Sequence, residues 1–145
     1  MSTLTLPKLT LLQWLGYLGL IPFVLLPLLG AAGLMEFGRA LQLFQLYGAL
    51  ILGFMAGVLW PVLYRPKVPG RRALVAVAFP VVSLVGFALM TPSQALVLQA
   101  ALFLGLRLFE YLAGVDRQYP VGYPVLRWQL TGVVVLMHLL FALAW

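Results

Sequence analysis

Apolar residues fill long, almost unbroken stretches of this chain, and short polar segments separate them. Each stretch is close to the ~20 residues that an α-helix needs to cross ~30 Å of hydrocarbon. The stretches cover residues 11–29, 44–63, 73–89, 94–112 and 125–145. They lack the alternation of polarity typical of membrane-spanning strands, so helices are expected. The pattern predicts one all-α domain over residues 1–145, an integral membrane protein built as a bundle of five transmembrane helices.

Local signals at the stretch ends refine this picture. The third and fourth stretches meet across MTPSQ, where Pro92 and Ser93 predict a tight helical hairpin. The first stretch is longer than the ~7–15 apolar residues of a signal peptide. Because further apolar stretches follow, we interpret it as a retained signal anchor. Prolines inside the stretches predict local loss of helical hydrogen bonds at Pro22, Pro27, Pro61 and Pro80.

Composition supports the membrane prediction. The chain is 64% hydrophobic and 8% charged, whereas soluble domains average about 45–50% apolar and about 25% charged residues. It contains no cysteine, which excludes disulfides, thiolate metal sites and cysteine catalysis.

The basic residues predict an orientation. Nine Lys and Arg against three Asp and Glu give a net charge of +6, which in a soluble protein would suggest nucleic acid but here is interpreted as a topology signal. Alternating loops place seven cations on one side: Lys8, Arg65, Lys67, Arg71, Arg72, Arg117 and Arg127. The other side holds Arg39. The positive-inside rule therefore predicts a cytoplasmic N-terminus and an outer C-terminus, with Trp14, Trp60, Trp128 and Trp145 near the interfaces.

Two acidic–basic pairs stand out at the end of the fourth stretch. Arg107 and Glu110 lie three residues apart inside the apolar run, and Asp116 and Arg117 follow it. One interpretation is an ion pair at a helix end, with Arg107 snorkelling over roughly 8 Å to the interface. The other is a substrate or proton site. We favour the snorkelling pair because neither charge reaches the bilayer midplane.

The remaining polar residues suggest helix contacts rather than catalysis. Side chains able to bond between helices are Gln13, Gln45, Ser83, Gln99, Thr131 and His138. His138 is the only histidine, so bis-histidine haem ligation and a zinc or di-iron cluster are not expected. No nucleophile–base set, GxSxG, P-loop or HExxH motif occurs. The sequence predicts no enzyme activity, no cofactor and no metal.

Small residues recur every fourth position in the second stretch. Ala49, Gly53 and Gly57 form one stripe, which permits close helix approach in lipid. Packing within the bundle is favoured over a dimer interface.

The second loop, residues 64–72, is short and basic. It is expected to attract anionic lipid headgroups, at about 1 kcal/mol for each charge near the surface, although its role in setting topology suffices to explain it.

Three segments carry a family resemblance. LGYLGLIPF (15–23), YGALILGFMAGVLWPV (47–62) and VDRQYPVGYPVLRWQLT (115–131) resemble a bacterial family of unknown function that includes transmembrane protein 69. The matching positions are Gly16, Gly19, Pro22, Tyr47, Gly48, Gly57, Trp60, Asp116, Arg117, Arg127 and Thr131. Leu59 departs from the family, which often has histidine there. The resemblance implies a multi-helix protein of the bacterial inner membrane.

Function is therefore expected to be non-enzymatic. We predict an accessory or assembly subunit of a larger membrane complex, a homo-oligomer, or a lipid-binding bundle. The alternative is a small transporter or proton pathway that uses Arg107, Glu110 and His138. A further hypothesis is that Asp116 pairs with Arg127 and clamps the turn containing Gly122 and Pro124.

Overall fold

The computed structural model describes residues 11, 13–63 and 65–144. Within these residues every regular element is a helix. After helical residues 13–18, the elements are α2 (Ile21–Ala31), α3 (Phe37–Gly57), α4 (Trp60–Leu63), α5 (Gly70–Leu89), α6 (Pro92–Leu112), the short 3-10 helix η1 (Val115–Gln118) and α7 (Tyr123–Ala144).

Five helical stretches are long and apolar enough to cross a membrane. They run Gln13–Ala31, Phe37–Leu63, Gly70–Leu89, Pro92–Leu112 and Tyr123–Ala144. The five-helix prediction is confirmed at this level. The second stretch begins at Phe37 rather than at residue 44, because α3 also includes the polar residues Arg39 and Gln42.

Prolines and caps explain the helix boundaries. The first stretch breaks at a turn over residues 19–20, and α2 begins immediately before Pro22, whose missing N–H is harmless in a first turn. The expected hairpin is present, since α5 ends at Leu89 and α6 begins at Pro92. A capping box closes the start of α6: the Thr91 hydroxyl accepts from the Gln94 N–H, and the Gln94 side chain accepts from the Thr91 N–H.

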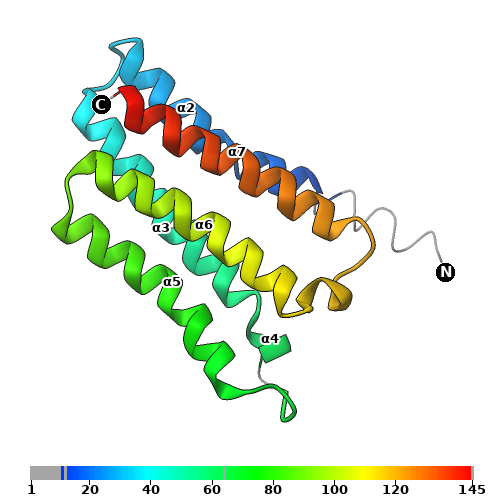
Figure 1. Cartoon of the computed structure of the whole chain (residues 1–145). Coiled ribbons are helices and arrows are strands. Elements are labelled where there is room, and N and C mark those ends of the chain that lie inside the picture. The colour runs from blue at the N-terminus through cyan, green and yellow to red at the C-terminus, as the bar shows by residue number, and fades with distance from the viewer. Residues whose placement is uncertain (1–10, 12, 64, 145) are drawn as a thin grey trace.

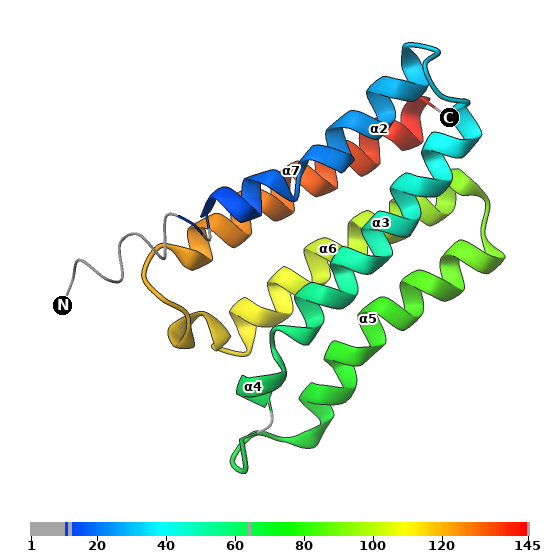
Figure 2. The ribbon, with the colours of Figure 1, turned by 180° about the vertical axis from the view of Figure 1, so that it is seen from behind.

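The helices form three layers (Figures 1 and 2). Helices α3 and α6 form the middle layer. Helices α2 and α7 lie side by side on one face, and α5 covers the other. Because α6 contacts α3, α5 and α7, polar side chains on α6 can reach several neighbours.

The bundle has two ends (Figure 1). We call one the basic end; it contains the α4–α5 loop, η1 and the start of α7. The opposite end contains the α2–α3 turn, the α5–α6 turn and the end of α7. Exposed Arg65 and Lys67 belong to the α4–α5 connection, exposed Arg71 lies in the first turn of α5, and exposed Arg117 lies in η1. Lys8 and Trp145 lie outside the described residues.

Aromatic residues from four helices fill the centre of the core. Phe23 of α2, Phe44 of α3 and Phe103 of α6 are buried. Their ring centroids lie 5.5 Å (Phe23–Phe44) and 6.1 Å (Phe23–Phe103) apart in edge-on geometry, which is favourable for phenyl pairs. Phe141 of α7 continues the cluster, with its ring 5.0 Å from Phe44.

Candidate functional site

Four charged side chains meet inside the bundle near the basic end. Arg107 and Glu110 come from α6, Asp116 from η1 and Arg127 from α7. We call these four residues the charge cluster. Arg107 Nη1 lies 2.5 Å from Glu110 Oε2, and Arg107 Nη2 lies 2.5 Å from Asp116 Oδ2. Arg127 donates from Nε to Glu110 Oε2 at 3.1 Å and pairs through Nη2 with Glu110 Oε1. Glu110 is therefore held by two guanidinium groups.

Burial shows that Arg107 does not snorkel. Its side chain is 1% exposed, Glu110 is 0% exposed and Arg127 is 2% exposed. The predicted Arg107–Glu110 ion pair is confirmed, but the expectation that the Arg107 side chain extends to the interface is wrong. Helix periodicity explains the difference: positions 107 and 110 lie on the face of α6 that packs against α7, so the charges point into the bundle.

The pairing also differs from the expected Asp116–Arg127 clamp. Asp116 pairs with Arg107, while Arg127 pairs with Glu110. The cluster still ties η1 to α6 and α6 to α7. Gly122, at the turn before α7, has φ of +90°, a conformation that glycine adopts without the steric cost of a Cβ. Arg117 is exposed beside Asp116 and takes no part in these ion pairs among the described residues.

Aromatic and sulfur groups surround the two arginines. Arg107 Cζ lies 4.8 Å from the centroid of the Trp128 ring, within cation–π range. Arg127 Cζ lies 6.0 Å from the rings of Tyr119 and Tyr123. Arg127 Nη1 also donates to the Met55 sulfur at 2.9 Å, which connects the charge cluster to α3.

The charges of the cluster cancel. Two guanidinium groups face two carboxylates, and both Glu110 oxygens contact Arg127 or Arg107. Some polar atoms nevertheless have no protein partner in the described part of the chain, namely Arg107 Nε, Asp116 Oδ1 and Tyr119 OH. Burial raises the pKa of the Tyr119 phenol, so this hydroxyl stays protonated at neutral pH. The arrangement, in which each carboxylate faces a guanidinium group, is typical of a structural clamp.

A second polar group lies deeper in the bundle. It contains Gln45 of α3, Ser83 of α5, Gln99 of α6 and His138 of α7, all buried. Gln99 Nε2 donates to the Gln45 carbonyl at 3.1 Å and to Ser83 Oγ at 3.0 Å. His138 Nε2 lies 2.7 Å from Gln99 Oε1. We call these four residues the amide–imidazole group. The sequence had marked each as a helix-contact residue, but no spacing signal joined them.

Gly48 makes room for this group. A Cβ built on Gly48 would lie 2.4 Å from Gln99 Oε1, far inside van der Waals contact. The predicted stripe lies to one side of this position: Gly53 faces Pro80 of α5, and a Cβ at Gly57 would meet nothing within 4 Å. Ala49 is half-buried. The tightest approach of α3 to α6 is thus one position away from the stripe.

An apolar interval separates the two polar groups. Along α6 it contains Phe103, and along α7 it contains Val134, both buried. Thr131 of α7 lies in the same interval and lines a small, mainly apolar hollow of about 130 Å³. Four hollows on the described part of the chain have linings that leave out Arg107, Glu110 and His138. These hollows therefore do not join the predicted proton-pathway residues.

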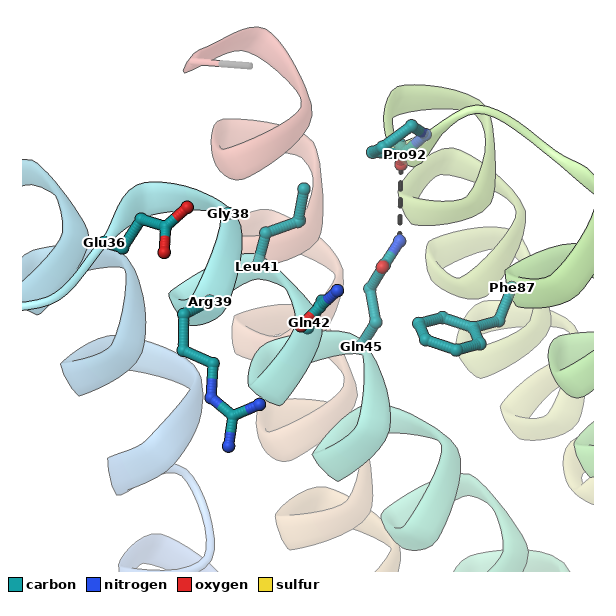
Figure 3. Close-up of a pocket in the computed structure, with 8 residues that line it drawn as sticks. All are labelled: Glu36, Gly38, Arg39, Leu41, Gln42, Gln45, Phe87 and Pro92. Atoms are coloured by element: carbon teal, nitrogen blue, oxygen red, sulfur yellow. Dashed lines mark hydrogen bonds between the residues drawn. The ribbon is translucent and has the colours of Figure 1, made fainter.

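One hollow opens at the opposite end (Figure 3). Its volume is about 460 Å³, and its lining is Glu36, Gly38, Arg39, Leu41, Gln42, Gln45, Phe87 and Pro92. Gln45 extends toward the α5–α6 turn and donates to the Pro92 carbonyl at 3.4 Å, whereas Arg39 points away from that contact (Figure 3). Gln45 thus belongs both to this hollow and to the amide–imidazole group.

The other predicted candidates lie outside these two groups. Tyr47 donates its hydroxyl to the Gly19 carbonyl at 2.8 Å, and its ring lies 4.9 Å from Phe23. It therefore binds the broken part of the first helical stretch to α3. Trp60 is 51% exposed on α4. Across the described residues, no three His, Asp or Glu side chains gather as a metal site would require.

Comparison with known proteins gives one match. The model of a family described as "Protein of unknown function (DUF3429)" matches residues 9–143. No curated protein and no solved structure matched the chain. The match covers both polar groups and all the helices described above except the last residue of α7.

Proposed function

The chain belongs to the DUF3429 family of proteins of unknown function, and from that premise we propose that it is a non-enzymatic, multi-pass membrane protein that acts by binding. It is an accessory or assembly subunit that packs against a larger membrane complex. Its membrane is the bacterial inner membrane, and its family is the one that includes transmembrane protein 69.

The observation that carries this proposal is the internal pairing of the charge cluster. Arg107, Glu110 and Arg127 are almost completely buried and are bonded to one another. Breaking such a set is costly, because each buried charge then lacks its partner. Groups used in this way stabilise a rigid scaffold and are not available to bind a substrate or to carry a proton.

Surface properties support the membrane and its lipids as binding partners. Large apolar side chains are exposed along every long helix, among them Leu28, Leu50 and Leu84, as expected for helices that face lipid or another membrane protein. At the basic end, Arg65, Lys67 and Arg71 are exposed. Arg72 instead donates to the Ala113 carbonyl at 3.3 Å and so ties α5 to the end of α6. The three exposed cations suit anionic headgroups.

The apolar interval disfavours the alternative of a continuous proton pathway. Such a pathway through Arg107, Glu110 and His138 would need polar groups or water between the two ends. At that level of the core, Thr131 is the one buried polar side chain among the described residues, and it lies beside the buried apolar Phe103 and Val134. The small hollow there is mainly apolar and does not reach His138 or Glu110, and Glu110 is bonded to two arginines.

Native purification tests the proposal. The tagged full-length protein is extracted from its own membranes in a mild detergent and examined by native mass spectrometry, with proteomics of the same sample. A tagged multi-pass protein of similar size from the same membrane is the control for detergent carry-over. We expect a larger partner in stoichiometric amount that the control does not retain. A lone chain, or a homodimer that carries only lipid, contradicts the accessory-subunit proposal.

A further inference from the structure

The His138 ring lies between two oxygen atoms that both act as hydrogen-bond acceptors. Its Nδ1 is 2.7 Å from the Val134 carbonyl oxygen, and its Nε2 is 2.7 Å from Gln99 Oε1. A backbone carbonyl has no proton to donate, so Nδ1 must carry a hydrogen to make its contact. The protonation of Nε2 then depends on which end of the Gln99 amide faces the ring.

Neighbours of Gln99 determine the orientation of that amide. Its Nε2 lies 3.1 Å from the Gln45 carbonyl oxygen and 3.0 Å from Ser83 Oγ. The Gln45 carbonyl can only accept, so the amide nitrogen must face it. An amide turned the other way would place two carbonyl-type oxygens against each other. The Gln99 oxygen therefore faces His138, and Nε2 of the ring also requires a hydrogen.

Aromatic rings surround the imidazole on its other sides. The centroids of Phe44, Phe103 and Phe23 lie 4.7, 5.5 and 5.7 Å from the His138 ring, and the side chain is 0% exposed. Phenyl rings attract a cation through their quadrupoles. The groups placed against His138 from α2, α3, α6 and its own helix are these three rings, Gln99 and Val134. No titratable group is among them.

From this geometry we infer that His138 is a proton-binding site, occupied as an imidazolium at neutral pH and held by two acceptor oxygens within a phenylalanine cage. Burial alone favours the neutral ring. Here, a neutral ring would place an unprotonated nitrogen 2.7 Å from an oxygen atom, either that of Val134 or that of Gln99, and the lone pairs of the two atoms would repel each other. Two charge-assisted hydrogen bonds and three aromatic rings favour the charged form instead.

Loss of the proton would affect three other helices. A neutral His138 with hydrogen on Nδ1 is satisfied only if the Gln99 amide turns and donates to Nε2. That turn removes the hydrogen bond of Gln99 to the Gln45 carbonyl of α3 and reverses the one with Ser83 of α5, whose hydroxyl must then donate to the Gln99 oxygen. Because Gln45 also lines the hollow at the opposite end, the proton on His138 is coupled to the packing beside that hollow. This inference is independent of the proposed accessory function.

Nitrogen NMR of the full-length protein tests the inference directly. Because His138 is the only histidine of the chain, ¹⁵N-histidine labelling reports on this ring alone when the purification tag contains no histidine. The protein is reconstituted in lipid bilayers at a pH of about 7.5, where a histidine of ordinary pKa about 6.5 is only about one tenth protonated. We expect both ring nitrogens to carry a hydrogen in more than about nine tenths of the molecules, ~10-fold above that reference. A spectrum with one protonated and one bare nitrogen overturns the inference and indicates the turned Gln99 amide.

Two variants test the role of Gln99. Gln99→Leu removes the acceptor at Nε2 and is expected to give a neutral ring at the same pH. Ser83→Ala is the matched control, because it removes a contact of Gln99 but keeps the oxygen that faces His138. It is expected to retain the imidazolium. An imidazolium that persists in a folded Gln99→Leu protein contradicts the role of the Gln99 oxygen; if that variant does not fold, the unmodified spectrum decides alone.

Discussion

At the scale of single residues, Glu110 holds the charge cluster together. Its two oxygens contact Arg107 and Arg127, so Glu110→Gln leaves two buried guanidinium groups with one carboxylate, that of Asp116. Breaking a buried pair in this way costs about 3–5 kcal/mol. We expect a large fall in thermal stability in detergent, measured by the fluorescence of the tryptophans. Arg117→Gln, at an exposed position of η1, is the control and should stay within about 0.5 kcal/mol of the unmodified protein. Equal stability of the two variants would contradict the structural role of the cluster.

Asp116 makes a smaller contribution because it is more exposed. Its side chain is 19% exposed and pairs with Arg107 alone. Asp116→Asn keeps the shape but removes the charge, and we expect a loss of about 1.5 kcal/mol, less than for Glu110→Gln. Chemical unfolding of both variants in the same detergent gives the comparison. If Asp116→Asn is the more damaging change, the order of burial does not determine the energetics of the cluster.

From the sequence, the spacing of three residues predicts the Arg107–Glu110 pair, which is confirmed, but it does not predict the other partners in the cluster. Arg127 enters the sequence analysis only as a loop cation and as the hypothesised partner of Asp116, whereas Arg107, Glu110, Asp116 and Arg117 stand out because charge is scarce in the chain. The other partners depend on the rotation of α6 against α7 and on the path of η1, which neither spacing nor composition specifies. Snorkelling was favoured because depth along one helix was considered without its neighbours. Arg107 and Glu110 are buried because they lie on the face of α6 that packs against α7.

At the scale of helices, Tyr47 stabilises the break in the first stretch. The turn over residues 19–20 leaves the Gly19 carbonyl to accept from the Tyr47 hydroxyl at 2.8 Å. Tyr47→Phe retains the ring but removes this bond, at an expected cost of about 1 kcal/mol. Hydrogen exchange should increase at the start of α2, while α5, which α2 does not contact in the main packing, should be unaffected. The matched control is Tyr111→Phe at an exposed tyrosine, and an equal exchange profile in the two variants would contradict the role of Tyr47.

Glycines of α3 provide a second test of helix packing. Gly48→Ala places a methyl group 2.4 Å from Gln99 Oε1 and must displace a buried, hydrogen-bonded side chain. We expect a loss of about 1–3 kcal/mol, the usual cost of overpacking. Gly57→Ala meets no atom within 4 Å and should be neutral or stabilising by up to about 1 kcal/mol, because alanine is the better helix former. The stability of both variants is measured by thermal unfolding. Equal changes in stability would show that the distance between α3 and α6 does not limit the size of the side chain at position 48.

The two glycines also show where sequence patterns stop being informative about packing. Spacing of four residues selects Ala49, Gly53 and Gly57 as a packing stripe. Of its two glycines, only Gly53 faces a neighbouring helix closely, at Pro80 of α5, and a Cβ at Gly57 would meet nothing within 4 Å. The closest approach is nevertheless at Gly48, where a long side chain of α6 fills the space. An α-helix has 3.6 residues per turn, so neighbouring stripes are hard to distinguish without knowing the position of the partner helix. The number of helices was predictable, since it depends only on apolar length.

At the scale of the whole molecule, the distribution of charge between the two ends predicts orientation. The α4–α5 connection and η1, which carry exposed cations, lie at one end of the bundle. Arg127 was counted with them from the sequence, but it is buried and paired with Glu110, and Lys8 lies outside the described residues. The exposed excess at the basic end remains: Arg65, Lys67, Arg71 and Arg117, against Arg39 at the other end. Positive charge in short loops is retained on the cytoplasmic side, so we expect the basic end to face the cytoplasm.

Single-cysteine labelling tests this orientation cleanly, because the chain has no cysteine of its own. Lys67→Cys places a thiol in the exposed loop of the basic end, and Leu34→Cys places one at a position that is 78% exposed in the α2–α3 turn. A maleimide that cannot cross membranes is applied to intact cells whose outer membrane has been made permeable. We expect Leu34→Cys to react there, and Lys67→Cys to react only after the inner membrane is opened. The two variants control for each other, since each must react fully in detergent. The reverse pattern would place the basic end outside, and reaction at both positions in intact cells would contradict insertion across the membrane with a single orientation.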